Sequence, residues 1–256
     1  MTGTRRRQCL AWLASATAAG WARADLSNVV TAVRSSLVPV GSFNATDNPR
    51  FSFRGSGFAV GDGSFVATNH HVLPATAEVE SLSRLAVLVG DPATGTPVAR
   101  RATVHASDRE HDLALLKIEG PALPAMTLAA DGSAREGQSI ALMGYPIGGV
   151  FGYSPVTHRG IIASITRVAL PAATAQQLDP RAVARLRAGS FEVLQLDATA
   201  YPGNSGGPVF DVETGTVLGV LNMVLVRGSR ESALSSPTGI SYAIPVRHLH
   251  KLLQSR

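Results

Sequence analysis

Short apolar runs separated by Gly, Pro, Asp and Asn recur along most of this chain. Hairpin turns are predicted at Asp62-Gly63 and Thr214-Gly215, because each pair lies between two apolar runs. Many short strands joined by tight turns are typical of β-barrels and β-sandwiches, so we expect an all-β protein. The candidate strands are 85–89, 113–118, 140–143, 161–165, 193–196, 217–221 and 240–244.

Short helices are predicted at three places within this pattern. Ser27-Asn28 is able to cap a helix that runs to about residue 35. A first-turn proline and a closing glycine predict a second helix over 181–188. Apolar residues at helical spacing predict a closing helix over 246–253, laid on a barrel. The segment 121–137 is rich in Pro, Ala and Gly, and it is the candidate link between two β units.

Residues 1–24 have the three parts of an export signal. They are a basic start with three arginines, an apolar stretch over 9–21, and the small-x-small cleavage form of Ala22-Arg23-Ala24. The apolar stretch is shorter than the roughly 20 residues of a membrane-spanning helix, so no stable membrane insertion is expected. We predict an exported protein, periplasmic or secreted, that begins near Asp25. The Sec and twin-arginine routes both stay open, and a buried N-terminal helix is the alternative interpretation.

The positive charge of the chain is concentrated in that first segment. The formal net charge is +5, from 23 Lys and Arg against 18 Asp and Glu. Four arginines and no acidic residue precede Asp25, which leaves 19 basic residues against 18 acidic ones in the remainder. This near balance removes the main argument for nucleic-acid binding. The only cysteine is Cys9, so no disulfide and no thiolate metal site is available downstream.

The sharpest chemical signal is the segment 201–209, in which glycines surround Ser205. A serine hydroxyl is a weak nucleophile unless a base takes its proton and hydrogen-bond donors stabilise the developing oxyanion. Glycines allow a sharp turn that exposes Oγ, and we expect the N–H groups of Gly203 and Ser205 to form the oxyanion hole. The alternative is a glycine-rich hairpin with an incidental serine.

A base and an orienting acid are available elsewhere in the chain. His70 and His71 follow an apolar run, and Asp112 directly precedes the run 113–118. Taken singly, a histidine pair is more often structural, and an aspartate at the start of a strand is usually a turn residue. A metal site built from these residues with His105 and His111 is a further alternative. Adjacent histidines on a strand point to opposite faces, however, so we expect no metal and no cofactor.

Taken together, these blocks resemble chymotrypsin-fold, trypsin-like serine proteases of the bacterial HtrA/Deg type. The likeness covers roughly 27–253 in the order His, Asp, Ser. It implies two six-stranded antiparallel barrels, about 37–120 and 138–245, within a protease domain over 25–256. Many members continue into a peptide-binding PDZ module, and we expect none in this chain. The blocks are Gly55-Ser56-Gly57-Phe58, 68–72, 111–118, 144–148, 160–162, 203–208 and Tyr242-Ala243-Ile244-Pro245.

The resemblance also assigns the catalytic roles. His71, which an apolar residue follows directly, acts as the base, Asp112 orients it, and Ser205 forms an acyl-enzyme. The implied function is a serine endopeptidase that hydrolyses exported or misfolded proteins, with peptides or unfolded chains as substrates. A catalytically inactive peptide-binding protein on the same scaffold is the alternative, and ester hydrolysis is a third possibility.

Specificity and assembly follow from the resemblance less directly. By the geometry of the family, the uncharged Thr199 lies at the base of the P1 pocket, and Leu221, Asn222 and Met223 form its wall. A small or medium apolar P1 residue is therefore expected.

Asn204 stands where digestive proteases have Asp, so no ion pair with a newly cut N-terminus is expected to control activity. The stretch 25–37 is compatible with a homotrimer and equally with a monomer.

Overall fold

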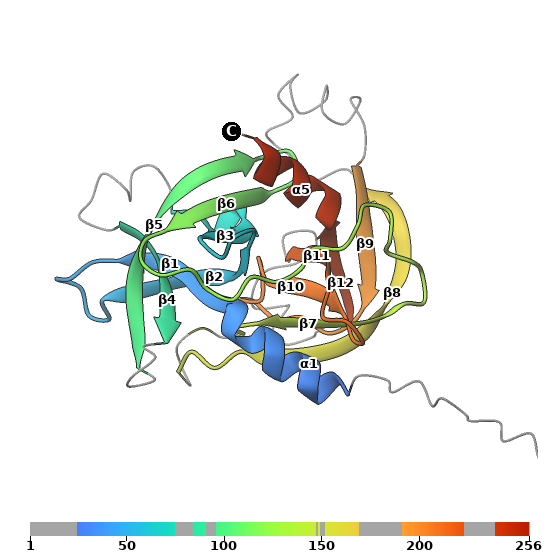
Figure 1. Ribbon diagram of the computed structural model, residues 1–256, viewed down its shortest axis with the longest axis horizontal. Coiled ribbons are helices and arrows are strands. Elements are labelled where there is room, and N and C mark those ends of the chain that lie inside the picture. Colours follow the sequence, from blue (N-terminus) through green and yellow to red (C-terminus); the bar gives the residue numbers. More distant parts are fainter. Residues whose placement is uncertain are drawn as a thin grey trace, which may run out of the picture.

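The computed structural model describes residues 25–74, 84–90, 96–146, 148, 152–168, 191–222 and 239–255. Within these residues, twelve strands form two closed antiparallel barrels of six strands each. The barrels lie side by side, the first in blue to green and the second in yellow to red (Figure 1). This arrangement confirms the predicted all-β class with two six-stranded barrels.

Each barrel is built from six strands that are consecutive in the sequence. The first contains β1 (Leu37–Phe43), β2 (Phe51–Val60), β3 (Phe65–Asn69), β4 (Arg84–Gly90), β5 (Pro97–Asp108) and β6 (Leu113–Ile118). The second contains β7 (Ser139–Gly144), β8 (Val156–Val168), β9 (Phe191–Asp197), β10 (Pro208–Asp211), β11 (Val217–Asn222) and β12 (Ile240–Pro245). The strand orders are β1-β2-β3-β6-β5-β4 and β10-β11-β12-β9-β8-β7.

Among the described residues the core has four clusters: one inside each barrel, one between the barrels, and a small one of Phe51, Ala86 and Leu88. Neighbouring residues of a strand alternate between clusters, because successive side chains of a strand point to opposite faces. Ala59 and Leu116 belong to the cluster of the first barrel, whereas their neighbours Phe58 and Leu115 belong to the cluster that both barrels share. Strands with two buried faces read as continuous apolar runs, which is why β6 was predicted with its observed bounds.

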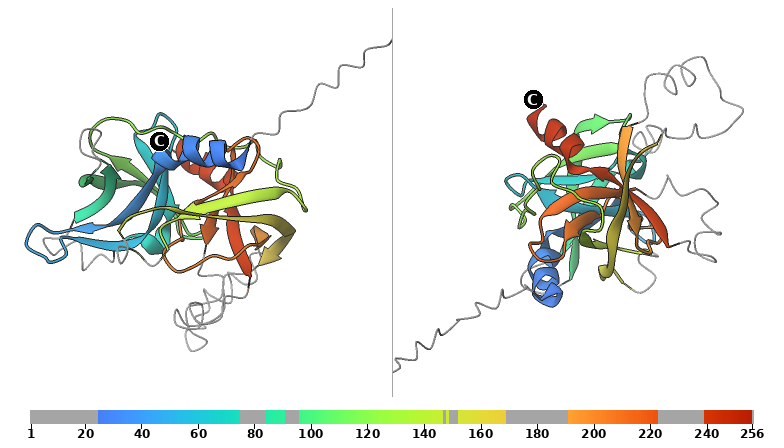
Figure 2. Two further views of the ribbon diagram at one scale, coloured as in Figure 1. Left: turned by 90° about the horizontal axis from the view of Figure 1, so that it is seen from below. Right: turned by 90° about the vertical axis from the view of Figure 1, so that its right-hand side faces the viewer.

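Two helices lie on opposite sides of the molecule (Figure 1, Figure 2). The helix α1 (Leu26–Val33) turns Val29 into the core, and α5 (Val246–Gln254) closes the chain on the barrels. The predicted cap at Ser27-Asn28 is wrong, because the carboxylate of Asp25 accepts the Ser27 N–H at 3.2 Å and caps α1 instead. The predicted helix over 181–188 and the predicted export signal over 1–24 lie outside the described residues.

The segment 119–138 joins β6 to β7, where the link between the two β units was predicted. Its middle runs along β11. The N–H of Val217 donates to the carbonyl of Thr127 at 2.8 Å, and the N–H of Ala129 donates to the carbonyl of Val217 at 2.9 Å. Among the helices that the structure describes, none combines the length and the apolar character needed to cross a membrane.

Candidate active site

The structure brings together His71 and Asp112, two of the residues singled out from the sequence. His71 lies in a 3₁₀ turn (His70–Val72) that follows β3, and Asp112 immediately precedes β6. The ring Nδ1 of His71 is 2.6 Å from Oδ2 of Asp112, and the backbone N–H of His71 donates to Oδ1 at 2.8 Å. The carboxylate therefore holds both the backbone and the imidazole of one residue.

The pairing of β3 with β6 explains why these two residues meet. Asn69 at the end of β3 lies opposite Leu113 at the start of β6, so the residues just beyond these ends are neighbours. The Asp112 carbonyl accepts the side-chain amide of Asn69 and the backbone N–H of His70, both at 3.0 Å. Asp112 itself has a left-handed φ of 53°, which Asp tolerates better than most residues. The conformation of Asp112 is thus held by hydrogen bonds to its carbonyl and to its carboxylate.

The second barrel contributes a further partner to the same carboxylate. The side-chain amide of Asn222, at the end of β11, donates to Oδ2 of Asp112 at 2.8 Å. Asn222 is fully buried and Asp112 is only 9% exposed. A buried carboxylate is costly unless hydrogen bonds satisfy it, and here three N–H groups do so. Sequence reasoning missed this contact, for which the available signal was one polar residue closing an otherwise apolar strand.

Of the four residues expected to form the substrate pocket, three are described, and only Thr199 among them has a side chain that solvent reaches. Thr199 is half-buried just after β9, and Met223 lies outside the described residues. Leu221 is fully buried, and its backbone bonds to Gly206 and Gly207, each at 2.9 Å. Since Leu221 and Asn222 are both inaccessible, neither side chain lines an open pocket, contrary to the expectation. Their backbone instead supports the turn that carries Ser205.

That turn is sharp, as its glycines predict, but Ser205 is buried, contrary to the expected exposure of its side chain. The N–H of Asn204 donates to the carbonyl of Tyr201 at 3.0 Å, which closes a four-residue turn. Pro202 occupies the second position, and Gly203, with a φ of 101°, occupies the third, as in a type II turn. Ser205 follows directly, and it is 6% exposed.

Ser56 of β2 fastens this turn to the first barrel. Its N–H donates to the carbonyl of Ser205 at 2.8 Å, and its hydroxyl donates to the carbonyl of Gly203 at 2.7 Å. The same hydroxyl accepts the N–H of Tyr145 at 2.9 Å. The segment around Ser205 is therefore held between the two barrels by both the backbone and the side chain of one serine.

Glycine is required where the turn meets the strand that leads to His71. Gly206 has a φ of 85°, and a Cβ there would overlap the carbonyl of Ser56 and lie 3.1 Å from the backbone nitrogen of Asn69. The residue after Ser205 thus contacts the end of β3, two positions before His71. No hydrogen bond joins the Ser205 hydroxyl to His71 within the described part of the chain.

The backbone N–H groups of the turn fall into two sets. Those of Asn204, Gly206 and Gly207 donate to carbonyl oxygens at 2.9–3.0 Å. Those of Gly203 and Ser205 have no acceptor among the residues that the structure describes. These are the two donors assigned from the sequence to the oxyanion hole, so they are available to a ligand atom.

Asn204 is unusual among the buried side chains of the turn. It is fully inaccessible, and neither its side-chain oxygen nor its nitrogen finds a hydrogen-bond partner among the described residues. Buried polar groups are rarely left unpaired. The side chain of Asn204 therefore brings neither a charge nor a hydrogen bond from the described residues to the turn, which is held by backbone bonds.

A hollow of about 620 Å³ opens beside His71 on the first barrel. No Asp or Glu is among the described residues that line it. Its cationic side chains favour acidic groups on this side of the site. Burial, with a contribution from Arg109, lowers the pKa of His70, which also faces the hollow. The arginines in its lining are Arg54, Arg84, Arg101 and Arg109.

Comparison with known proteins places this geometry in a family. The family model described as "Trypsin-like peptidase domain" matches residues 55–220. A probable periplasmic serine endoprotease DegP-like of Halomonas elongata is 30% identical over 192 residues, which are 75% of this chain and 32% of that protein. Protease Do-like 5, chloroplastic, of Arabidopsis thaliana is 30% identical over 203 residues, 78% of this chain and 56% of that protein. The chain thus spans about a third to a half of these relatives.

Solved structures share the fold over nearly the whole chain. The crystal structure of Deg5 has a TM-score of 0.62 at 24% identity and covers 88% of this chain and 90% of its own. The HtrA-type protease AlgW with decapeptide has a TM-score of 0.63 at 23% identity and covers 90% of this chain and 67% of its own. The resemblance to HtrA/Deg proteases seen in the sequence is confirmed. This chain belongs to the family of trypsin-like peptidase domains.

Proposed function

We propose that this protein is a serine endopeptidase in which Ser205 attacks the peptide carbonyl and His71 acts as the general base. The observation that carries the proposal is the His71–Asp112 pair, in which one buried carboxylate accepts three N–H groups. The pair lies beside the turn that presents Ser205 and two unpaired N–H groups. This combination of base, nucleophile and oxyanion donors is what acyl transfer requires.

The contacts support a definite division of roles. Because Nδ1 of His71 faces Asp112, its proton-bearing tautomer leaves Nε2 free to accept the Ser205 proton. The N–H groups of Gly203 and Ser205 then donate to the oxyanion of the tetrahedral intermediate. His71 returns the proton to the leaving amine, and water later hydrolyses the acyl-enzyme by the same route. Hydrogen bonds of this kind often tighten only when substrate binds.

The proposed substrates are exported or misfolded proteins, cleaved after small or medium apolar residues. Thr199 supports this preference, because an uncharged base of the pocket offers no partner to Lys or Arg. The names of relatives such as the DegP-like endoprotease of Halomonas elongata support a periplasmic place of action. An AlgW variant solved with a tripeptide, 25% identical, supports peptides as the ligand class. The proposed catalytic residues all belong to one chain, and both a homotrimer and a monomer remain compatible with them.

Covalent labelling with a fluorophosphonate, read by peptide mass spectrometry, tests the proposal together with proteolysis of an unfolded protein. We expect the label on Ser205. We expect Ser205→Ala to lose the label and to reduce proteolysis by more than about 10⁴-fold. Proteolysis that persists in Ser205→Ala would place the chemistry at another site. A folded wild-type protein that neither labels nor cleaves would favour the peptide-binding alternative.

A further inference from the structure

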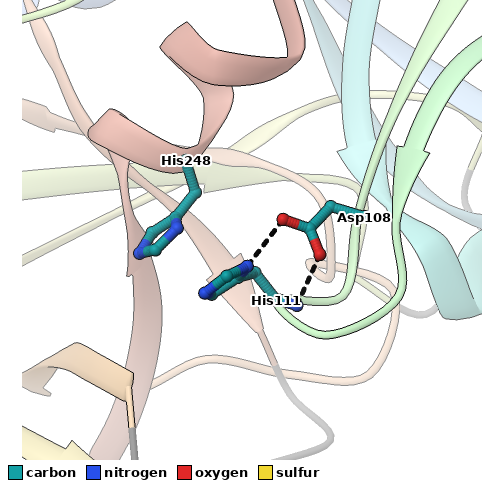
Figure 3. A group of neighbouring side chains, drawn as sticks. All are labelled: Asp108, His111 and His248. Carbon is teal, nitrogen blue, oxygen red and sulfur yellow. Dashed lines mark hydrogen bonds and ion pairs between the residues drawn. The ribbon is translucent and has the colours of Figure 1, made fainter.

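A second aspartate–histidine pair lies next to the proposed active site, and a buried histidine faces it (Figure 3). Asp108 ends β5, His111 lies in the turn before Asp112, and His248 lies near the start of α5. The ring Nδ1 of His111 is 2.6 Å from Oδ2 of Asp108. The rings of His111 and His248 stack, with 3.7 Å between centroids and 27° between planes. No sequence pattern links these three residues, since His248 is 137 positions from His111.

The three side chains offer a set of donor atoms close to one another. One donor atom from each residue lies within 4.8 Å of the other two. Oδ1 of Asp108 accepts the backbone N–H groups of Glu110 at 3.0 Å and of His111 at 3.1 Å, so the carboxylate is fixed in place. Its Oδ2 bonds the His111 ring. A metal ion that replaces this contact would require the two atoms to separate to roughly 3.4 Å, given metal–ligand bonds of about 2.0–2.2 Å.

His248 supplies the independent observation that points to a ligand. It is only 6% exposed, and its Nδ1 is buried without a hydrogen-bond partner among the described residues. Figure 3 shows its ring turned toward the His111 and Asp108 pair. Burial, reinforced by the nearby His111 and Arg247, lowers the pKa of His248 to about 4. The imidazole is therefore neutral at pH 7, which is the form that binds metals.

The carboxylate of Asp108 can be reached from solvent. A surface hollow of about 660 Å³ is lined by Asp108, Glu110 and Lys251, and it connects the carboxylate to solvent. Phe191 packs its ring edge against His111 at 4.9 Å between centroids, which closes one side with an apolar wall. On its other side, Nε2 of His248 accepts a hydrogen bond from Nε of Arg247 at 3.4 Å, and the guanidinium of Arg247 is paired with Glu192 at 2.5 Å.

We propose that Asp108, His111 and His248 form a binding site for a divalent transition-metal ion, and that Zn²⁺ fits it best. Two imidazoles and one carboxylate with an open fourth position are a common ligand set of protein-bound Zn²⁺. Because two of the three donors are nitrogen, the site disfavours Mg²⁺ and Ca²⁺. To direct both nitrogens to one ion, the stacked rings must rotate out of their nearly parallel arrangement. The His248 proton must also move from Nδ1 to Nε2, which gives up the hydrogen bond from Arg247. His111 then carries its proton on Nε2.

Bound metal would join α5 to the turn that leads into Asp112. The ion would replace a ring stack with three metal–ligand bonds between elements that are far apart in the sequence. Since all three ligands come together only in the folded chain, the ion stabilises that state, and the stabilisation increases with the logarithm of the metal concentration once this exceeds Kd. The binding itself does not depend on peptidase activity, so it is measured in a Ser205→Ala background, which excludes self-digestion.

Calorimetric titration of chelator-treated Ser205→Ala protein with Zn²⁺ tests the proposal. We expect saturable binding of one equivalent, an increase in Tm of several degrees, and no competition from Mg²⁺. We expect His248→Gln and Asp108→Asn to weaken binding by at least about 100-fold, which is the upper end of what losing a supporting partner outside the coordination sphere produces. The matched control is His71→Gln, which removes the other Asp–His pair and should leave the affinity unchanged.

Two results would overturn the site. One is the absence of saturable Zn²⁺ binding to the folded protein. The other is binding that survives His248→Gln and Asp108→Asn but disappears in His71→Gln, because the metal would then lie at the proposed catalytic pair. Circular dichroism without metal shows whether each variant is folded. If His248→Gln does not fold, the visible absorption of Co²⁺ bound to the Ser205→Ala protein decides, since four-coordinate binding by two imidazoles supports the site and a six-coordinate aqua-like spectrum contradicts it.

Discussion

At the residue scale, Asp112 connects the backbone of one barrel to the proposed base. Its left-handed φ of 53° directs the carbonyl toward Asn69 and His70, while the carboxylate faces His71 and Asn222. Four neighbouring residues thus depend on one conformation. The tautomer of His71 depends on it too, because only an acceptor at Nδ1 keeps Nε2 free for the serine proton.

Asn222 is the residue whose role in this arrangement is most directly testable. In Asn222→Leu the Asp112 carboxylate loses one of its three N–H donors and remains buried. We expect kcat to fall by about 10–100-fold with KM nearly unchanged, because the variant loosens the base without removing a substrate contact. Steady-state kinetics on a peptide substrate measure kcat and KM separately.

The conservative control is Asn222→Ser, which keeps a hydrogen-bond donor on a shorter side chain. Its kcat should lie between those of the wild type and Asn222→Leu. If both variants reduced only the Tm and left kcat intact, Asn222 would serve packing alone and would not position Asp112.

The residues of the site differ in how far the sequence could identify them. Ser205 lies in a glycine-rich pattern whose chemistry is recognisable locally. The choice of His71 and Asp112 needed the resemblance to a family, because each residue alone is more often structural. The contact of Asn222 with Asp112 joins residues 110 positions apart, and it exists only after both barrels close. The burial of His248 against His111 could not be predicted for a similar reason. The closing helix was predicted from its apolar spacing, which gives no sign that a histidine on that helix is buried.

At the scale of elements, strand prediction succeeded where a continuous apolar run marks the strand and failed where polar residues, Gly or Pro interrupt the run. The bounds of β6 were predicted from a continuous apolar run, whereas no strand was predicted at β5, which is largely exposed and carries Arg100 and Arg101. The first strand, β1, was also missed, because Pro39 and Gly41 interrupt its apolar pattern. Its strand character comes from pairing with β2 and β4, which periodicity cannot reveal.

The turn around Ser205 is an element whose position depends on a glycine. In Gly206→Ala the new Cβ would overlap the Ser56 carbonyl, in addition to the strain of a φ of 85°. We expect this variant to lose proteolytic activity by at least about 100-fold, because the turn must move away from β3 and His71. Peptide hydrolysis and fluorophosphonate labelling rates measure the loss.

Gly132→Ala is the matched control for this turn. Gly132 also has a positive φ, of 71°, but a Cβ there would meet nothing within 4 Å. It should lower the free energy of unfolding by about 1 kcal/mol and leave activity intact. Equal losses of activity in both variants would show that strain alone, and not contact with the first barrel, explains the effect.

At the scale of the whole molecule, the proposed site is an interface between two barrels. The first supplies His71 and Asp112, and the second supplies Ser205 and Asn222. Direct bonds cross between them, from Ser56 N–H to the Ser205 carbonyl at 2.8 Å and from the Asn222 amide to Asp112 at 2.8 Å. The order of the motifs in the sequence indicates such a site. The crossing bonds require the docked barrels, so local patterns do not reveal them.

The stability of the whole fold is expected to depend on pH through buried histidines, and His158 on β8 gives a clear case. Its Nε2 is buried without a partner among the described residues, and its ring lies 5.6 Å from that of Tyr201, which begins the Ser205 turn. Burial lowers the pKa of His158 below its ordinary value of 6.5. Below pH 6.5, His158 therefore binds a proton more readily in the unfolded chain than in the folded one. The free energy of unfolding consequently decreases as the pH falls toward the lowered pKa.

Urea unfolding of Ser205→Ala protein at pH 7, 6 and 5 measures this dependence. His158→Gln should flatten the decrease in the free energy of unfolding, by at most about 1.4 kcal/mol per pH unit and by less because the ring is only half-buried. A slope that stays the same after His158→Gln would mean that His158 takes up its proton in the folded state as readily as in the unfolded chain. In that case the unpaired Nε2 beside Tyr201 would find an acceptor on protonation, and the Ser205 turn would tolerate a positive charge next to it.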